Sequence, residues 1–323
     1  MEMVSPTFIN AISTIKWWHI TIFLISVHFI KAIYLRVKYL STRVPVLPKG
    51  TKRLVNYPNP KPVIIDFSNY YEIHYTFFSI LLVPYEKNVL YVDDLMHENN
   101  PDKTTDTKDY VLRYQERLHS YIHNKLNLSI IKNSNFCSGI IFKIFKGFCE
   151  IAIHGFVFFP NIVSGMVANF EQCFYFIEGV ESFFKILPNN NAFCKVFLWH
   201  FYEEIEHNQE SSYLFLVYQG TWKYFYILLS APLVFSMLLI TITFQLITII
   251  FMTPIIWKIP FLLKSFNHLC QWIAMIILSA LLLFFNINAS DEVINKDLAL
   301  FRKLFQERFK ESLEGKNVTV NFE

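Results

Sequence analysis

The stretch FLWHFYEEIEHNQESSYLF, residues 197–215, places two histidines and four carboxylates among otherwise apolar, helix-forming residues. Moving even one ionised carboxylate from water into an apolar interior is costly. Either this segment is a helix with one face in solvent, or its ionisable groups converge on a metal ion that neutralises them. The distribution of similar residues along the rest of the chain favours the second interpretation.

The composition is typical of an all-α protein, part of which lies in lipid. Of the 323 residues only 8 are glycine, whereas 53% are hydrophobic and 18% aromatic, and the mean hydropathy is +0.32. β-Rich and dinucleotide-binding proteins usually contain more glycine. The net charge of +3 comes without a basic cluster, so we expect no nucleic-acid partner. The five cysteines include no C-x-x-C pair, which argues against a disulfide framework or a zinc finger.

Apolar and polar stretches divide the chain into four predicted regions. Residues 1–62 contain an apolar run at 17–34, which is a membrane anchor or a buried helix, then a basic flank and a proline-rich connector. Residues 63–222 form the predicted helical bundle. Residues 223–290 form a transmembrane helix or hairpin, and residues 291–323 an amphipathic helix with a tail. The later helices of the bundle are expected at about 110–132, 136–158, 162–187 and 192–218.

The strongest transmembrane signal is the segment from Tyr224 to Trp257, which contains no charged residue. At about 1.5 Å per residue, a helix of this length exceeds the roughly 30 Å hydrocarbon core of a bilayer. A second apolar run at 269–289 makes a hairpin with it, which either crosses the bilayer or enters and returns. Basic residues after the N-terminal run place the bundle on the cytosolic side. We therefore expect a membrane protein whose partners include membrane lipids.

The C-terminal helix expected at 291–314 has one apolar stripe. The stripe consists of Ile294, Leu298, Phe301, Phe305 and Phe309. A stripe of this kind suits either a membrane surface or the surface of the bundle.

Four ionisable side chains of the opening stretch share one face of the expected helix. At about 100° per residue, Glu203 and Glu204 fall within about 60° of His200. His207 falls on the same face, whereas Glu206 points elsewhere. Glu204 and His207 are spaced i, i+3, and such an E-x-x-H pair lets one helix offer a carboxylate and an imidazole to one metal.

A second pair with the same spacing lies on the helix expected at 110–132. Glu116 and His119 are again i, i+3, and His123 follows one turn later on the same face. A single E-x-x-H pair arises easily by chance. Two copies on separate helices are the arrangement of a four-helix di-metal site.

Two further carboxylates complete the predicted site, because a four-helix di-metal site takes one from each of two additional helices. Glu86 is the lone carboxylate of an apolar segment before the first pair, and Glu171 holds the corresponding place before the second. Glu178, seven residues later on the same face, is a reserve candidate. The predicted metal ligands are therefore Glu86, Glu116, His119, Glu171, Glu204 and His207.

Four carboxylates and two imidazoles suit two divalent first-row metal ions. Iron is favoured, with manganese or zinc as alternatives, because zinc prefers fewer and softer ligands. Without metal, four buried carboxylates would repel one another and would have to bind protons. His123, His200 and Glu203 are the candidate catalytic residues beside this set. Each of the two histidines is an extra ligand, a partner of a ligand or a proton carrier.

At these residues the chain resembles a mostly bacterial family described as predicted metal-dependent hydrolases, related to the ferritin-like di-iron proteins. WHFYEEIEH at 199–207 is similar to that family's WHxxEExEH pattern, and QERLHSYIH at 115–123 to its QExxHxxxH pattern. SILLVPYE at 79–86 is similar to the segment that ends in the family's first ligand. The resemblance covers about residues 70–220 and implies a ferritin-like, di-metal helical bundle at 63–222 with added transmembrane helices.

The chain departs from the family at two places. Pro84 lies two residues before Glu86 rather than three, and Tyr213 stands where the family has an aspartate. Both changes leave the predicted ligands in place, so they concern the substrate rather than the metal.

Three hypotheses about function follow. The first is a membrane-associated di-iron oxidase or oxygenase acting on a small apolar, lipid-like substrate, since a carboxylate-rich site with one histidine per metal resembles sites that reduce O₂. The second is hydrolysis by a metal-activated water, which the resemblance implies. The third is a membrane scaffold that has lost its chemistry and binds no metal.

Overall fold

The structure is a computed structural model that describes most of the chain. The described ranges are 63–99, 107–155, 160–175, 179–187, 193–205, 222–285 and 291–310, with the isolated positions Phe23 and Ser26. Every regular element within these ranges is a helix, which confirms the predicted all-α class. Apart from the two isolated positions, the predicted anchor at 17–34 and the proline-rich connector lie outside the described residues.

The helices largely follow the sequence pattern. Their bounds are α3 (Tyr70–Asn99), α4 (Thr107–Asn133), α5 (Phe136–Gly155), α6 (Pro160–Tyr175), α7 (Gly179–Ile186), α9 (Lys223–Met252), α10 (Ile255–Phe285) and α11 (Asp291–Phe309). A further helix, called the 193–205 helix below, covers those residues. Where one helix was expected at 162–187, the structure has α6 and α7. The helix expected to reach residue 314 ends at Phe309, because Lys310 has a left-handed φ of 56° that ends an α-helix.

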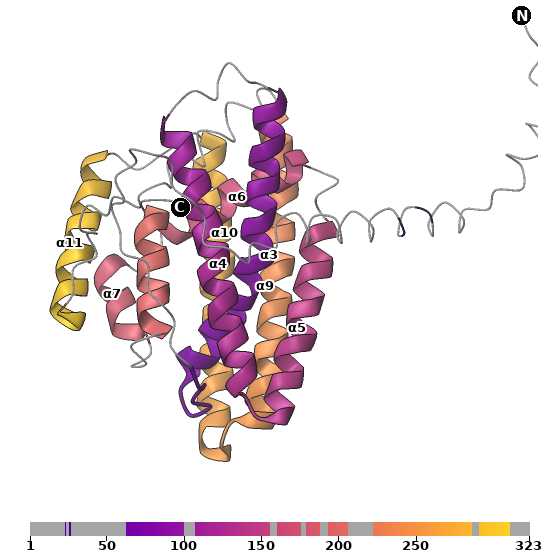
Figure 1. Cartoon of the computed structure of the whole chain (residues 1–323), viewed down its shortest axis with the longest axis vertical. Coiled ribbons are helices and arrows are strands. Elements are labelled where there is room, and N and C mark those ends of the chain that lie inside the picture. Colours follow the sequence, from indigo (N-terminus) through magenta and orange to yellow (C-terminus); the bar gives the residue numbers. More distant parts are fainter. Residues whose placement is uncertain are drawn as a thin grey trace, which may run out of the picture.

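Helix α3 lies at the centre of the bundle, where it contacts α4, α5, α6 and α9. Together with α10, three of these neighbours, α4, α5 and α9, run with α3 along the long axis of the molecule (Figure 1). The ring of Phe77 packs edge-on against Phe142 of α5, with centroids 5.4 Å apart. The adjacent Phe78 points to another side and contacts Trp272 of α10 at 5.8 Å. Because α3 is surrounded in this way, its ionisable residues enter the protein interior.

Helices α9 and α10 form the predicted apolar hairpin, and the turn between them lies at the lower end of the molecule in Figure 1. The turn follows Thr253, and the Trp257 N–H donates to the Pro254 carbonyl at 2.9 Å. Both helices are long and apolar enough to cross a membrane. Large side chains such as Leu228 and Phe266 point outward, with 68% and 66% of their surface exposed. An apolar outer surface of this extent suits contact with lipid.

Helix α6 is joined to the hairpin by a close approach and by hydrogen bonds. A β-carbon at Gly165 would lie only 3.1 Å from the Tyr226 carbonyl oxygen of α9. Asn169 Nδ2 donates to Ser230 Oγ of α9 at 2.9 Å, and Ser279 Oγ of α10 donates to the Asn169 carbonyl at 2.7 Å. Small residues and interhelical hydrogen bonds are the usual way to join apolar helices.

Helix α11 packs on the bundle beside α7 (Figure 1). Four members of the predicted stripe are buried: Ile294, Leu298, Phe301 and Phe305. The ring of Phe301 lies 4.9 Å from Phe184 of α7, and Arg302 Nε donates to the Tyr202 hydroxyl of the 193–205 helix at 2.8 Å. Of the two alternatives for this helix, the structure therefore shows packing on protein, and α11 covers the outer side of the 193–205 helix.

Candidate metal centre

Three helices bring a group of histidines and glutamates together in the interior. Helix α3 contributes Glu86, α4 contributes His119 and His123, and the 193–205 helix contributes His200, Glu203 and Glu204. All six side chains are buried, with 0–3% of the residue surface exposed. Lone ionisable groups rarely enter a core at this depth, so partners or a metal ion must offset the lost hydration.

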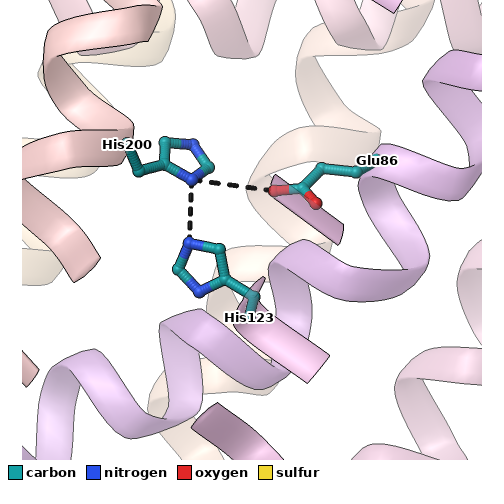
Figure 2. A group of neighbouring side chains, drawn as sticks. All are labelled: Glu86, His123 and His200. Carbon is teal, nitrogen blue, oxygen red and sulfur yellow. Dashed lines mark hydrogen bonds and ion pairs between the residues drawn. The ribbon is translucent and has the colours of Figure 1, made fainter. Parts of the chain in front are cut away.

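The first candidate metal-binding group consists of Glu86, His123 and His200, which converge from three helices in Figure 2. His123 Nε2 lies 2.8 Å from His200 Nδ1, and Glu86 Oε1 lies 3.7 Å from the same His200 nitrogen. Atoms that share a metal at about 2.1 Å lie roughly 3.0–3.4 Å apart. The two imidazole planes are inclined by 75°, so their in-plane lone pairs can meet at one point. The two observed distances lie a few tenths of an ångström outside this range, so small shifts of the side chains would let this group hold a metal ion.

The second candidate group consists of His119, His200 and Glu204. Glu204 Oε1 lies 2.6 Å from His200 Nε2 and 3.5 Å from His119 Nδ1. The two imidazoles are stacked, with centroids 4.2 Å apart and planes inclined by 20°. Nearly parallel rings direct their in-plane lone pairs side by side, so this group needs a ring rotation before both nitrogens bind one ion. The first group is therefore the better formed of the two.

Glu203 determines which nitrogen His119 presents to the second group. Glu203 Oε2 lies 2.7 Å from His119 Nε2. A carboxylate accepts a hydrogen bond, so Nε2 carries the proton and Nδ1 directs its lone pair toward Glu204. Metal-binding histidines commonly donate their other N–H to a carboxylate in this way.

A row of three hydrogen bonds through the site ends at a short contact between two lone pairs. Hydrogen bonds of 2.8 Å join Asn127 Oδ1, Ser79 Oγ, His123 and His200 in that order. The Ser79 hydroxyl and the two neutral imidazoles supply the three protons that these bonds require. His200 Nε2 then lies 2.6 Å from Glu204 Oε1 without the geometry of a hydrogen bond, so a lone pair of the ring faces the carboxylate. A metal ion or a further proton would offset the repulsion at this contact.

The surroundings favour a metal ion over a proton on the rings. Burial lowers the pKa of His200 to about 3 and, together with the neighbouring His200, holds the pKa of His123 well below its usual range. Both imidazoles are therefore neutral at physiological pH, which is the form that binds metals. A dication bound by Glu86, His123 Nε2 and His200 Nδ1 would place the single proton of His200 on Nε2, which faces Glu204 Oε1.

The side chains of three of the six predicted ligands are described in the structure, and those of the other three are not. The structure places Glu86 in the first candidate group and His119 and Glu204 in the second, and His200 belongs to both. Glu116 and Glu171 lie on α4 and α6, but their side chains are outside the described residues, as is the whole of His207. Whether these three reach the site remains a prediction.

The candidate catalytic residues lie inside the cluster. His123 and His200 bring their nitrogens to Glu86, which makes them candidate ligands, and Glu203 is the partner of His119. Sequence reasoning missed Ser79 and Asn127, which contact His123. Helical spacing was the available signal, because Ser79 precedes Glu86 by seven residues and Asn127 follows His123 by four.

Comparisons of the chain with family models, with curated proteins and with solved structures found no match. The resemblance to the metal-dependent hydrolases therefore stays a prediction.

Proposed function

We propose that this chain is a membrane-associated, metal-dependent oxidase or oxygenase acting on an apolar, lipid-like substrate. The observation that carries the proposal is the buried convergence of Glu86, His123 and His200 from three helices. Two histidines and one carboxylate with open positions are the ligand set of non-haem Fe(II) oxygenases. Bound iron would supply the redox chemistry with O₂, and these three side chains would hold it.

A second metal position beside His119 and Glu204 would make the site a di-metal centre of the ferritin-like kind. Glu116 lies one turn before His119 on α4, and Glu171 lies on α6, which contacts α3. These two residues would raise the number of carboxylates around the second ion, and His207 would add an imidazole. In this arrangement Glu203 holds the imidazole of His119 and keeps its Nδ1 directed at Glu204.

The apolar surroundings support an apolar substrate. The Trp199 ring contacts His119, and the Phe197 ring contacts His123, at centroid distances of 5.0 and 5.3 Å. Helix α3, which holds Glu86, contacts α9, one of the two helices apolar enough to cross a membrane. O₂ and lipid chains enter such an environment without losing favourable hydration, whereas a charged substrate would lose it.

The test uses the full chain purified in detergent and loaded anaerobically with Fe(II). Elemental mass spectrometry measures bound metal, and an oxygen electrode measures O₂ consumption with a long-chain fatty acid as probe. We expect the wild type to bind iron and consume O₂, and His200→Ala to lose both. His74→Ala, which changes a buried histidine elsewhere on α3, should retain both. A folded wild type that binds no redox-active metal would overturn the proposal.

Hydrolysis is the second candidate, because two histidines and a glutamate also bind zinc in hydrolases. There the metal lowers the pKa of a bound water. Anaerobic assay with the ethyl ester of the same fatty acid separates the two candidates. Ester cleavage with Zn²⁺ or Mn²⁺ in the absence of O₂ would support the hydrolase. A scaffold without chemistry would bind none of these metals and would tolerate a double change of Glu116 and Glu204 to alanine.

A further inference from the structure

We infer that Ser79 and Asn127 are positioning residues that hold His123 as its Nδ1–H tautomer and leave Nε2 free to bind metal. The inference rests on the proposed metal site. It concerns side chains that lie behind His123 as seen from Glu86 and His200, and neither has a role in the proposal above.

The first step is the orientation of the Asn127 amide. Asn127 Nδ2 donates to the backbone carbonyl of Ser79 at 3.0 Å, and Ser79 Oγ donates to Asn127 Oδ1 at 2.8 Å. Exchanging the amide nitrogen and oxygen would place two oxygen atoms against each other at the carbonyl. Both side chains are fully buried, so water cannot relieve such a contact. The amide therefore has one acceptable orientation.

The second step follows from the single proton of the Ser79 hydroxyl. That proton is used in the bond to Asn127 Oδ1, so Ser79 Oγ can only accept from its other neighbour. The other neighbour is His123 Nδ1, at 2.8 Å. His123 Nδ1 must therefore carry the proton of the neutral ring, and Nε2 must present its lone pair.

The third step is the direction of that lone pair. His123 Nε2 lies 2.8 Å from His200 Nδ1, at the centre of the first candidate group. Ser79 and Asn127 thus do for His123 what Glu203 does for His119, but with neutral groups that add no charge to the site. On each α4 histidine, a hydrogen bond at one ring nitrogen fixes the tautomer and directs the lone pair of the other nitrogen at the candidate site.

The tautomer is read directly in the folded wild type. The probe is ¹⁵N NMR of the full chain in detergent with ¹⁵N-labelled histidine side chains, and the His123 signals are assigned by their loss in His123→Gln. We expect a protonated Nδ1 and an unprotonated Nε2 in the metal-free protein, and a shift of Nε2 when Zn²⁺ is added. An Nε2–H tautomer in the metal-free wild type would overturn the inference.

Binding of Co²⁺ alone tests the consequence for metal affinity. We expect Ser79→Ala to weaken Co²⁺ binding by roughly 10- to 100-fold and to mix the two tautomers of His123. Ser79→Thr keeps a hydroxyl and should restore both properties. Thr76→Val is the matched control, because it removes another buried hydroxyl of α3 whose bond goes to the Glu72 carbonyl, away from the site.

The outcomes separate this inference from the proposed function. If the wild type shows the Nδ1–H tautomer but binds no metal, the positioning role stands and the proposed function fails. If the wild type binds metal while Ser79→Ala keeps the same affinity and the same tautomer, the positioning role fails and the metal site stands.

Discussion

Two histidine clusters lie against α3, and they differ in how their short contacts are satisfied. One is the metal cluster described above. The other, here the hairpin cluster, consists of Tyr70, His74, Gln245, Ser265 and His268 and joins α3 to α9 and α10. The presence of more than one histidine does not distinguish them as candidate sites.

The hairpin cluster has a proton for every described contact. His74 Nδ1–H donates to Gln245 Oε1 at 2.9 Å, and Gln245 Nε2 donates to Ser265 Oγ at 3.1 Å. The Tyr70 hydroxyl and His268 Nδ1 share one proton across 3.1 Å. Burial lowers the pKa of His74 to about 4, and the neutral ring suffices for its one bond. In the metal cluster, by contrast, the His200 Nε2 lone pair faces the Glu204 carboxylate at 2.6 Å, and this contact rather than the presence of histidine marks the candidate cation site.

The largest expected effect is that of His200→Ala on metal binding. His200 belongs to both candidate groups, through a different nitrogen in each. We expect Co²⁺ affinity to fall by more than roughly 100-fold, beyond the range for loss of a ligand's hydrogen-bond partner. Competition with a chelator measures the affinity. His74→Ala in the hairpin cluster is the control, and equal losses in both variants would remove the distinction between the clusters.

Metal should stabilise the wild type and not His200→Ala. At a free Co²⁺ concentration of 100 times the dissociation constant, mass action adds about 2.7 kcal/mol to the free energy of unfolding. Thermal unfolding in detergent, followed by circular dichroism with and without chelator, measures the difference. An unfolding temperature of the wild type that does not respond to Co²⁺ would show that the contact between His200 Nε2 and Glu204 is relieved without a metal ion.

Gln245→Leu should lower stability without changing metal affinity. The substitution leaves the buried His74 Nδ1–H and Ser265 Oγ without the partners they have now, at a cost of about 1–3 kcal/mol. Thermal unfolding measures the first effect and Co²⁺ titration the second. A tenfold loss of Co²⁺ affinity in this variant would mean that the hairpin cluster takes part in metal binding.

The smallest effect is expected for Glu203→Gln. The glutamine carbonyl can still accept from His119 Nε2–H, although the loss of the carboxylate charge weakens that bond. Co²⁺ affinity should therefore fall by less than roughly tenfold. Glu203→Leu, which accepts no hydrogen bond, should have the larger effect. The reverse order would show that Glu203 acts through its charge and not by holding His119.

The parts of the site that were predictable depend on local periodicity. Glu86, His119 and Glu204 were recognisable because each lies in an apolar helical pattern and two of them belong to E-x-x-H pairs. An α-helix repeats every 3.6 residues in any surroundings, so the face on which a residue lies is known before the fold is. The expectation of one histidine per metal was less informative, because His119, His123 and His200 all lie within the described cluster.

By itself, the sequence determined the all-α class, the apolar hairpin and the helix faces on which the acids and histidines lie. These properties follow from composition and helical period, which each segment has alone. Only the tertiary structure decided that His123 meets His200, that Ser79 and Asn127 support His123, and that His74 belongs to a completed network. Such contacts depend on how packed helices are rotated and spaced, and differences of a few tenths of an ångström decide which nitrogen faces which atom.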